Sequence, residues 1–87
     1  MAETQKELSP KVAYSIELVD TLTTNGQYLS PEELFTKETK GCKEKGIQNV
    51  KSMSSSLAYA RTKGLIKSQK QERNGKLVTC YTSIKNQ

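Results

Sequence analysis

The dipeptide Asn74-Gly75 is the sequence feature that most restricts how this chain can fold. Asn-Gly favours a two-residue hairpin turn, because both central residues of a type I′ turn need a positive φ. The segment after it, Leu77 to Ile84, is rich in β-forming side chains, and an earlier strand is expected to open at Leu65-Ile66. The expected cross-strand pairs are Arg73 with Lys76, Gln71 with Val78, and Gln69 with Cys80. The chain is therefore predicted to end in an antiparallel two-stranded hairpin.

Three helices are predicted ahead of this hairpin, and each of the first two opens on a Ser-Pro pair. Ser9 caps the first, which is expected from Pro10 to about Thr23, where Asn25-Gly26 ends it. Gln27-Tyr28-Leu29 is expected to be a short extended piece. Ser30-Pro31-Glu32-Glu33 then forms a capping box for a second helix, about Pro31 to Lys40. The glycines of Gly41–Gly46 predict a turn.

A third helix is expected to start at Asn49, as its N-cap, and to end at Lys63-Gly64. On a helical wheel one side is apolar, with Val50, Met53, Leu57 and Ala60 as the expected core stripe. The other side gathers Lys51, Ser52, Ser55, Tyr59 and Thr62. Serine lowers helix propensity by several tenths of a kcal/mol relative to alanine. Four serines among residues 52–56 therefore favour a contact role for this side over a merely solvated face.

Charge is divided unevenly along the 87 residues. Residues 1–40 carry four Lys+Arg and seven Asp+Glu, a net charge of −3. Residues 41–87 carry ten Lys+Arg and two Asp+Glu, a net charge of +8. Such asymmetry favours a polyanion as the partner of the basic half, although solubilising lysines alone would give the same count.

Several classes of function find little support. The chain has no histidine, which excludes His-dependent triads and His-containing zinc sites. Glu32 and Glu33 are adjacent on a helix and cannot flank a substrate together. No Gly-rich phosphate loop, signal peptide or apolar run of about 20 residues is present. We therefore expect a non-enzymatic, soluble, cytoplasmic or nuclear protein with no cofactor, metal, membrane or small-molecule ligand.

The order of elements, and the stretch Arg61-Thr62-Lys63-Gly64-Leu65-Ile66 in particular, resembles the winged helix-turn-helix family. The resemblance implies an α+β fold of three helices plus a C-terminal two-stranded wing, in a domain over residues 9–85. Residues 1–8 are polar and lack periodicity, which indicates a flexible tail. It implies a recognition helix at about residues 50–63 in the DNA major groove and a wing at 65–84 on the flanking backbone.

The expected function is that of a sequence-specific, double-stranded DNA-binding transcriptional regulator, a homodimer of phage or plasmid origin. The residues expected to contact DNA are Gln48, Asn49, Lys51, Ser52, Ser54, Ser55, Tyr59, Thr62, Lys63, Arg73 and Lys76. Two alternatives remain open: a protein–protein interaction module of a larger assembly, and a binder of structured RNA.

Individual side chains carry expectations of their own. Arg61 is expected either to contact phosphate or to form an ion pair with Glu32 or Glu33. Tyr14, Tyr28, Phe35 and Met53 are expected in or at the edge of the core. Both cysteines are expected to be free, with Cys42 exposed on a turn and Cys80 half-buried on a strand.

Overall fold

The computed structural model describes residues 9–84 and is a small α+β domain. Its elements are the helices α2 (Pro10–Leu22), α3 (Pro31–Lys37), α4 (Thr39–Glu44) and α5 (Val50–Thr62), the 3₁₀ turn η1 (Thr24–Gly26), and the strands β1 (Ile66–Arg73) and β2 (Lys76–Ser83). The α+β class is confirmed, with four α-helices among the described residues where three were expected. The predicted tail, residues 1–8, and Lys85 lie outside the described residues.

Helices α2, α3 and α5 begin where their capping residues predict. Ser9 Oγ accepts a hydrogen bond from the Val12 N–H at 3.3 Å, and Asn49 Oδ1 accepts one from the Ser52 N–H at 2.8 Å. In the capping box of α3, Ser30 Oγ accepts from the Glu33 N–H at 3.1 Å, and Glu33 Oε1 accepts from the Ser30 N–H at 2.8 Å. Each cap satisfies an N–H that has no partner within its helix, which is why these local signals were sufficient.

The hairpin has the predicted register. Asn74 and Gly75 both have positive φ, 55° and 80°, as a type I′ turn requires. The expected pairs of Arg73 with Lys76, Gln71 with Val78 and Gln69 with Cys80 are all present. The short extended piece before α3 is also present, because Leu29 forms an antiparallel bridge with Tyr81 through N–H···O bonds of 3.0 and 2.8 Å. This bridge joins the base of the hairpin to the helices.

The segment predicted as the end of the second helix and a turn is folded differently. α3 ends at Lys37, and residues 39–44 form the separate helix α4. The helix is interrupted at Glu38, whose φ is −136°. Thr39 Oγ1 donates a hydrogen bond to the Phe35 carbonyl at 2.8 Å. Gly41 is helical, and its missing side chain leaves room for the Tyr14 hydroxyl. Packing against α2, rather than a turn, therefore accounts for this glycine.

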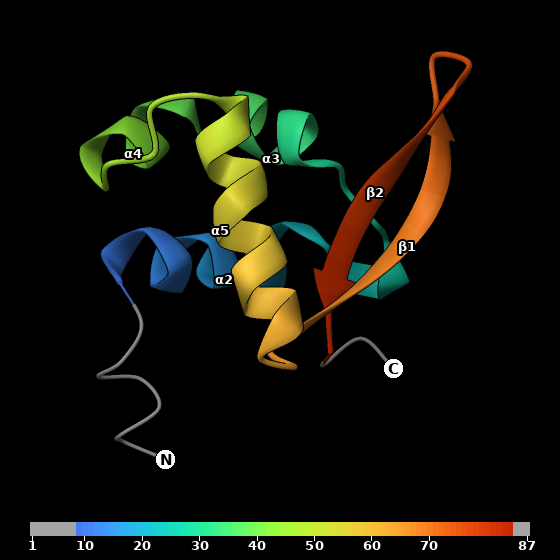
Figure 1. The fold of residues 1–87 in the computed structure, drawn as a ribbon, viewed down its shortest axis with the longest axis horizontal. Helices are drawn as coiled ribbons and strands as arrows, with labels where there is room; N and C mark the ends of the chain where they lie inside the picture. Colours follow the sequence, from blue (N-terminus) through green and yellow to red (C-terminus); the bar gives the residue numbers. More distant parts are fainter. Residues whose placement is uncertain (1–8, 85–87) are drawn as a thin grey trace.

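One core joins the helices and the base of the hairpin. Its largest fully buried side chains include Val19, Leu34, Ile47, Met53 and Leu57. Tyr14 and Phe35 pack at its edge, as expected. Figure 1 shows α5 crossing in front of α2, with the hairpin beside it.

Three burial expectations, for Val50, Cys42 and Cys80, are wrong. Val50 is 38% exposed, so the buried face of α5 is Met53, Ser56, Leu57 and Ala60, and the inward position of Ser56 removes it from the outer face. Cys42 is buried in α4, and Cys80 is fully rather than half buried. Burial raises the pKa of both thiols above the ordinary value.

Candidate nucleic-acid interface

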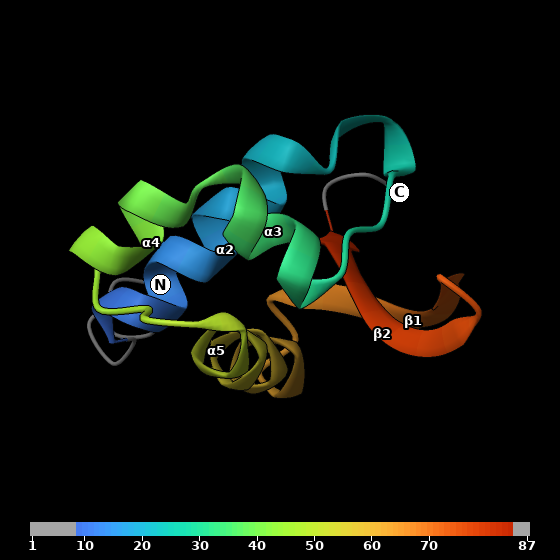
Figure 2. The same cartoon turned by 90° about the horizontal axis from the view of Figure 1, so that it is seen from above.

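The outward face of α5 is the largest element of the candidate interface. Figure 2 shows α5 along one edge of the molecule, with α2, α3 and α4 on the opposite side of it. This face is lined by exposed Lys51, Ser55, Ala58, Tyr59 and Thr62, with Ser52 and Ser54 half-buried beside them. A helix face with mostly short side chains can approach a groove or a backbone closely.

Two hollows separate this helix from its neighbours. The first, about 620 Å³, lies between the start of α5, the start of α3 and the hairpin, and Lys51, Ser54, Ser55 and Lys76 line it. The second, about 410 Å³, lies between the C-terminal half of α5 and the hairpin. Its lining includes Ala58, Arg61, Thr62, Ser68 and Lys70. Together, the helix and hairpin form a concave face along the length of α5.

The charge on these elements is strongly one-sided. Residues 50–83, which span α5 and the hairpin, contain seven Lys+Arg and one acidic residue, Glu72. Residues 10–49 contain five Lys+Arg and six Asp+Glu. Glu32, in the first turn of α3, is the acidic residue that lines the first hollow. The concave face is therefore basic, with one carboxylate at its margin.

The predicted contact residues on α5 come together. Lys51, Ser55, Tyr59 and Thr62 share its outward face, and Lys63 follows at the C-cap with its Nζ 5.5 Å from the centroid of the Tyr59 ring. The hydroxyl of Thr62 already donates to the Ala58 carbonyl at 3.0 Å.

Two further predicted contacts precede α5. Gln48 and Asn49 are both exposed at the start of the helix. The side-chain oxygen Oδ1 of Asn49 accepts the capping hydrogen bond, which leaves the side-chain NH₂ as the group that can face a ligand.

Arg61 joins α5 to the hairpin, and its expected phosphate contact stays a prediction. Its Nε donates to Ser68 Oγ at 2.7 Å, which joins the end of α5 to β1. The expected ion pair with Glu32 or Glu33 is wrong, because the Glu33 carboxylate pairs with Arg73 instead.

The hairpin residues that line the second hollow were not predicted from sequence, and they include Ser68, Gln69, Lys70 and Thr79. The predicted register contained the signal. Alternate residues share one face of a strand, so the core residue Ile66 places Ser68 and Lys70 on its own side.

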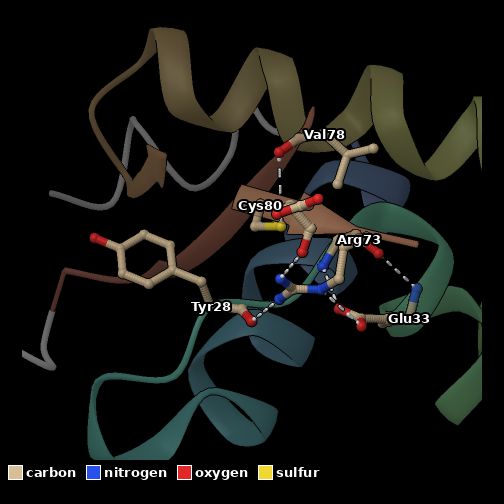
Figure 3. A network of polar contacts seen from close by, with 7 residues as sticks. Tyr28, Glu33, Arg73, Val78 and Cys80 are labelled. Atoms are coloured by element: carbon tan, nitrogen blue, oxygen red, sulfur yellow. Dashed lines mark hydrogen bonds and ion pairs between the residues drawn. The ribbon is translucent and has the colours of Figure 1, made fainter. Parts of the chain in front are cut away.

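Arg73 lies in a network rather than standing free near the hairpin tip (Figure 3). Its Nε donates to Glu33 Oε2 at 3.0 Å, its Nη2 to the Tyr28 carbonyl at 3.0 Å, and its Nη1 to the Glu72 carbonyl at 3.1 Å. Arg73 therefore has a counterion within the protein, Glu33, and its expected contact with DNA stays a prediction. Lys76, its cross-strand partner, is exposed beside the first hollow.

Two observations bear on other kinds of site. Within residues 9–84, no group of three or more His, Cys, Asp or Glu side chains is arranged to hold a metal ion. No helix in the same range is long and apolar enough to cross a membrane.

Comparison with known proteins adds no family to this description. No protein-family model matches the chain, and no curated protein or solved structure matches it significantly. The residues of the concave face therefore carry the evidence for a function.

Proposed function

We propose that this chain is a winged helix-turn-helix protein that binds double-stranded DNA as a sequence-specific transcriptional regulator. In this proposal α5 enters the major groove and the hairpin contacts the flanking backbone. The observation that carries it is the basic concave face formed by α5 and the hairpin. Its two hollows are lined by five cations and one carboxylate: Lys51, Arg61, Lys70, Arg73 and Lys76, with Glu32. A surface of this charge attracts the phosphates of a duplex.

The dimensions of α5 agree with this role. Its 13 residues extend over about 20 Å at 1.5 Å per residue. The B-DNA major groove is about 12 Å wide and admits an α-helix. Short side chains such as Ser55 and Ala58 at the middle of the outward face would allow the helix to approach the base edges. The order of helices and the Leu29 bridge to the hairpin also support a winged-helix arrangement.

The contacts divide into two kinds. Lys51, Lys63, Lys70 and Lys76 supply charge for phosphates, which position the protein without reading sequence. Gln48 is an exposed amide beside the start of α5, and a glutamine can form a bidentate pair with adenine. The hydroxyls of Ser54 and Ser55 can donate or accept at either groove wall.

The test is a fluorescence-anisotropy titration of a random-sequence 25-base-pair duplex at several salt concentrations. Four lysine–phosphate contacts predict a slope of log K against log salt of about −3.6, because each contact contributes about −0.9. Ser55→Glu should weaken binding about tenfold or more, because it adds a negative charge to the outward face of α5. Ala13→Glu is the matched control: it adds the same charge at an exposed position of α2 outside both hollows, and should change the affinity little.

Other outcomes separate the alternatives. Equal effects of Ser55→Glu and Ala13→Glu would reject α5 as the DNA-contacting element. Absence of duplex binding at low salt would reject the proposal in favour of a protein partner, and tighter binding of an RNA hairpin of equal length would favour structured RNA. Selection from a random duplex pool should give a palindromic consensus if the chain acts as a homodimer.

A further inference from the structure

The hairpin is attached to the helices at both of its ends. At its base, Leu29 bridges to Tyr81, and the Ser83 N–H donates to Thr23 Oγ1 at 3.1 Å. Near its tip the attachment is Arg73, the last residue of β1. Five residue steps separate Tyr81 from Lys76, which is about 17 Å of strand. The Arg73 network therefore acts far from the other attachment.

The Glu33 carboxylate serves two elements at once. Its Oε1 accepts the Ser30 N–H of the capping box, and its Oε2 accepts the Arg73 Nε. Partial burial by itself raises the pKa of this carboxyl, but the hydrogen bonds from Ser30 and Arg73 outweigh burial and hold the pKa below its ordinary value. The carboxylate is thus charged at neutral pH and joins the start of α3 to the end of β1.

The Tyr28 carbonyl gives Arg73 a second anchor on the helical side. Arg73 is separated from Glu33 by 40 positions and from Tyr28 by 45. A planar guanidinium with donors in a fixed fork can satisfy two such acceptors at defined angles, whereas an ammonium cannot reproduce the fork. Arg73 therefore restrains the direction of the hairpin as well as its distance from α3.

We propose that Arg73 is a positioning residue, and that its contacts with Glu33 and Tyr28 hold the hairpin tip at the angle at which Lys76 and α5 reach the same DNA duplex. This inference depends on the proposed DNA-binding function. A two-stranded hairpin without other support is only marginally stable, so a hairpin released at its tip would be ordered only on binding. The ordering would weaken the affinity.

The sign of one substitution separates this role from simple electrostatics. Glu33→Gln removes a negative charge beside the basic face, so charge alone predicts tighter DNA binding. Loss of the restraint predicts weaker binding, by about three- to tenfold. Glutamine is also accepted at this position of a capping box, but its one amide oxygen cannot replace two carboxylate oxygens. Glu32→Gln is the matched control, because Glu32 lines the first hollow, and its neutralisation should tighten binding.

Two further variants examine how the restraint acts. Arg73→Lys keeps the charge but loses the fork, so it should weaken DNA binding about as much as Glu33→Gln does. In a Lys76→Ala background, Glu33→Gln should have a smaller effect than in the parent protein, because the contact that the hairpin positions is already absent. General destabilisation would give additive effects of Glu33→Gln and Lys76→Ala.

A measurement on the free protein tests the positioning role of Arg73 separately from the proposed DNA-binding function. In the free protein, Glu33→Gln should speed amide hydrogen exchange in residues 71–78 by about tenfold, with little change at the core of α5. Faster exchange at the tip without any DNA binding would support the restraint and reject the DNA function. Unchanged exchange at the tip, or tighter DNA binding by both Glu33→Gln and Glu32→Gln, would overturn the role proposed for Arg73.

Discussion

Replacing Leu57 with alanine tests which face of α5 belongs to the core, and hence which face is available to a ligand. Leu57 is fully buried and Val50 is 38% exposed, although the helical wheel places both on one apolar stripe. Truncating a buried leucine to alanine costs about 2–5 kcal/mol. A domain of this length has about 4–13 kcal/mol of stability in total. At about 4–8 °C per kcal/mol, Leu57→Ala should lower Tm by at least about 8 °C or unfold the protein.

Val50→Ala provides the contrast on the same helix. It removes two methyl groups, each of which contributes about 0.8 kcal/mol of stability when fully buried. Because Val50 is only roughly 60% buried, the expected loss is about 1 kcal/mol. The better helix propensity of alanine returns about 0.5 kcal/mol. The expected net loss of about 0.5 kcal/mol corresponds to about 2–4 °C in Tm.

Thermal and urea unfolding followed by circular dichroism would measure both variants. The reasoning is refuted if Val50→Ala destabilises the protein as much as Leu57→Ala. α5 would then be rotated about its axis, and Ser54 and Ser55 would no longer face outward.

Three other predictions follow from particular contacts. Lys76→Ala should flatten the salt slope of DNA binding by about 0.9, whereas Arg73→Ala should flatten it by much less, because Glu33 already neutralises Arg73; equal slopes for both variants would contradict this. The parent protein should be more stable than Glu33→Gln, and this difference should be complete above the ordinary carboxyl pKa of 4.5. It should be lost as pH falls through the lowered pKa of Glu33 in the folded state. Urea unfolding at pH 7, 4 and 3 measures the difference, and a difference that does not decline would contradict the prediction. Gly41→Ala should destabilise the protein by about 1–3 kcal/mol, because the new Cβ meets the Tyr14 hydroxyl; a higher Tm would show that helix propensity outweighs this clash.

Features of the fold set by neighbouring residues were predictable from sequence. The three N-caps and the Asn74-Gly75 turn depend on side chains or φ values within a few positions, and the turn fixes the register of the whole hairpin. The split between α3 and α4 was not predictable in this way. Gly41 resembles a turn residue in isolation, and its helical role depends on Tyr14, 27 positions earlier.

The candidate site was predictable to a similar extent. Helical periodicity was enough to bring Lys51, Ser55 and Tyr59 to one face of α5. It could not identify the counterion of Arg73, because Glu33 is 40 positions away and many carboxylates are equally plausible from sequence alone. The face of the hairpin that lies toward α5 required the register and one core residue, Ile66, to be combined.

The two buried cysteines can serve as internal probes of local unfolding. A thiol reacts as an exposed thiolate, so it must be both accessible to solvent and ionised. Cys42 and Cys80 are buried, and burial also raises the pKa of both thiols, which disfavours the thiolate. A thiol-specific reagent would therefore modify each sulfur only when its surroundings open. Since Cys42 belongs to α4 and Cys80 to β2, their separate modification rates would measure the opening of the helical side and of the hairpin without any added label.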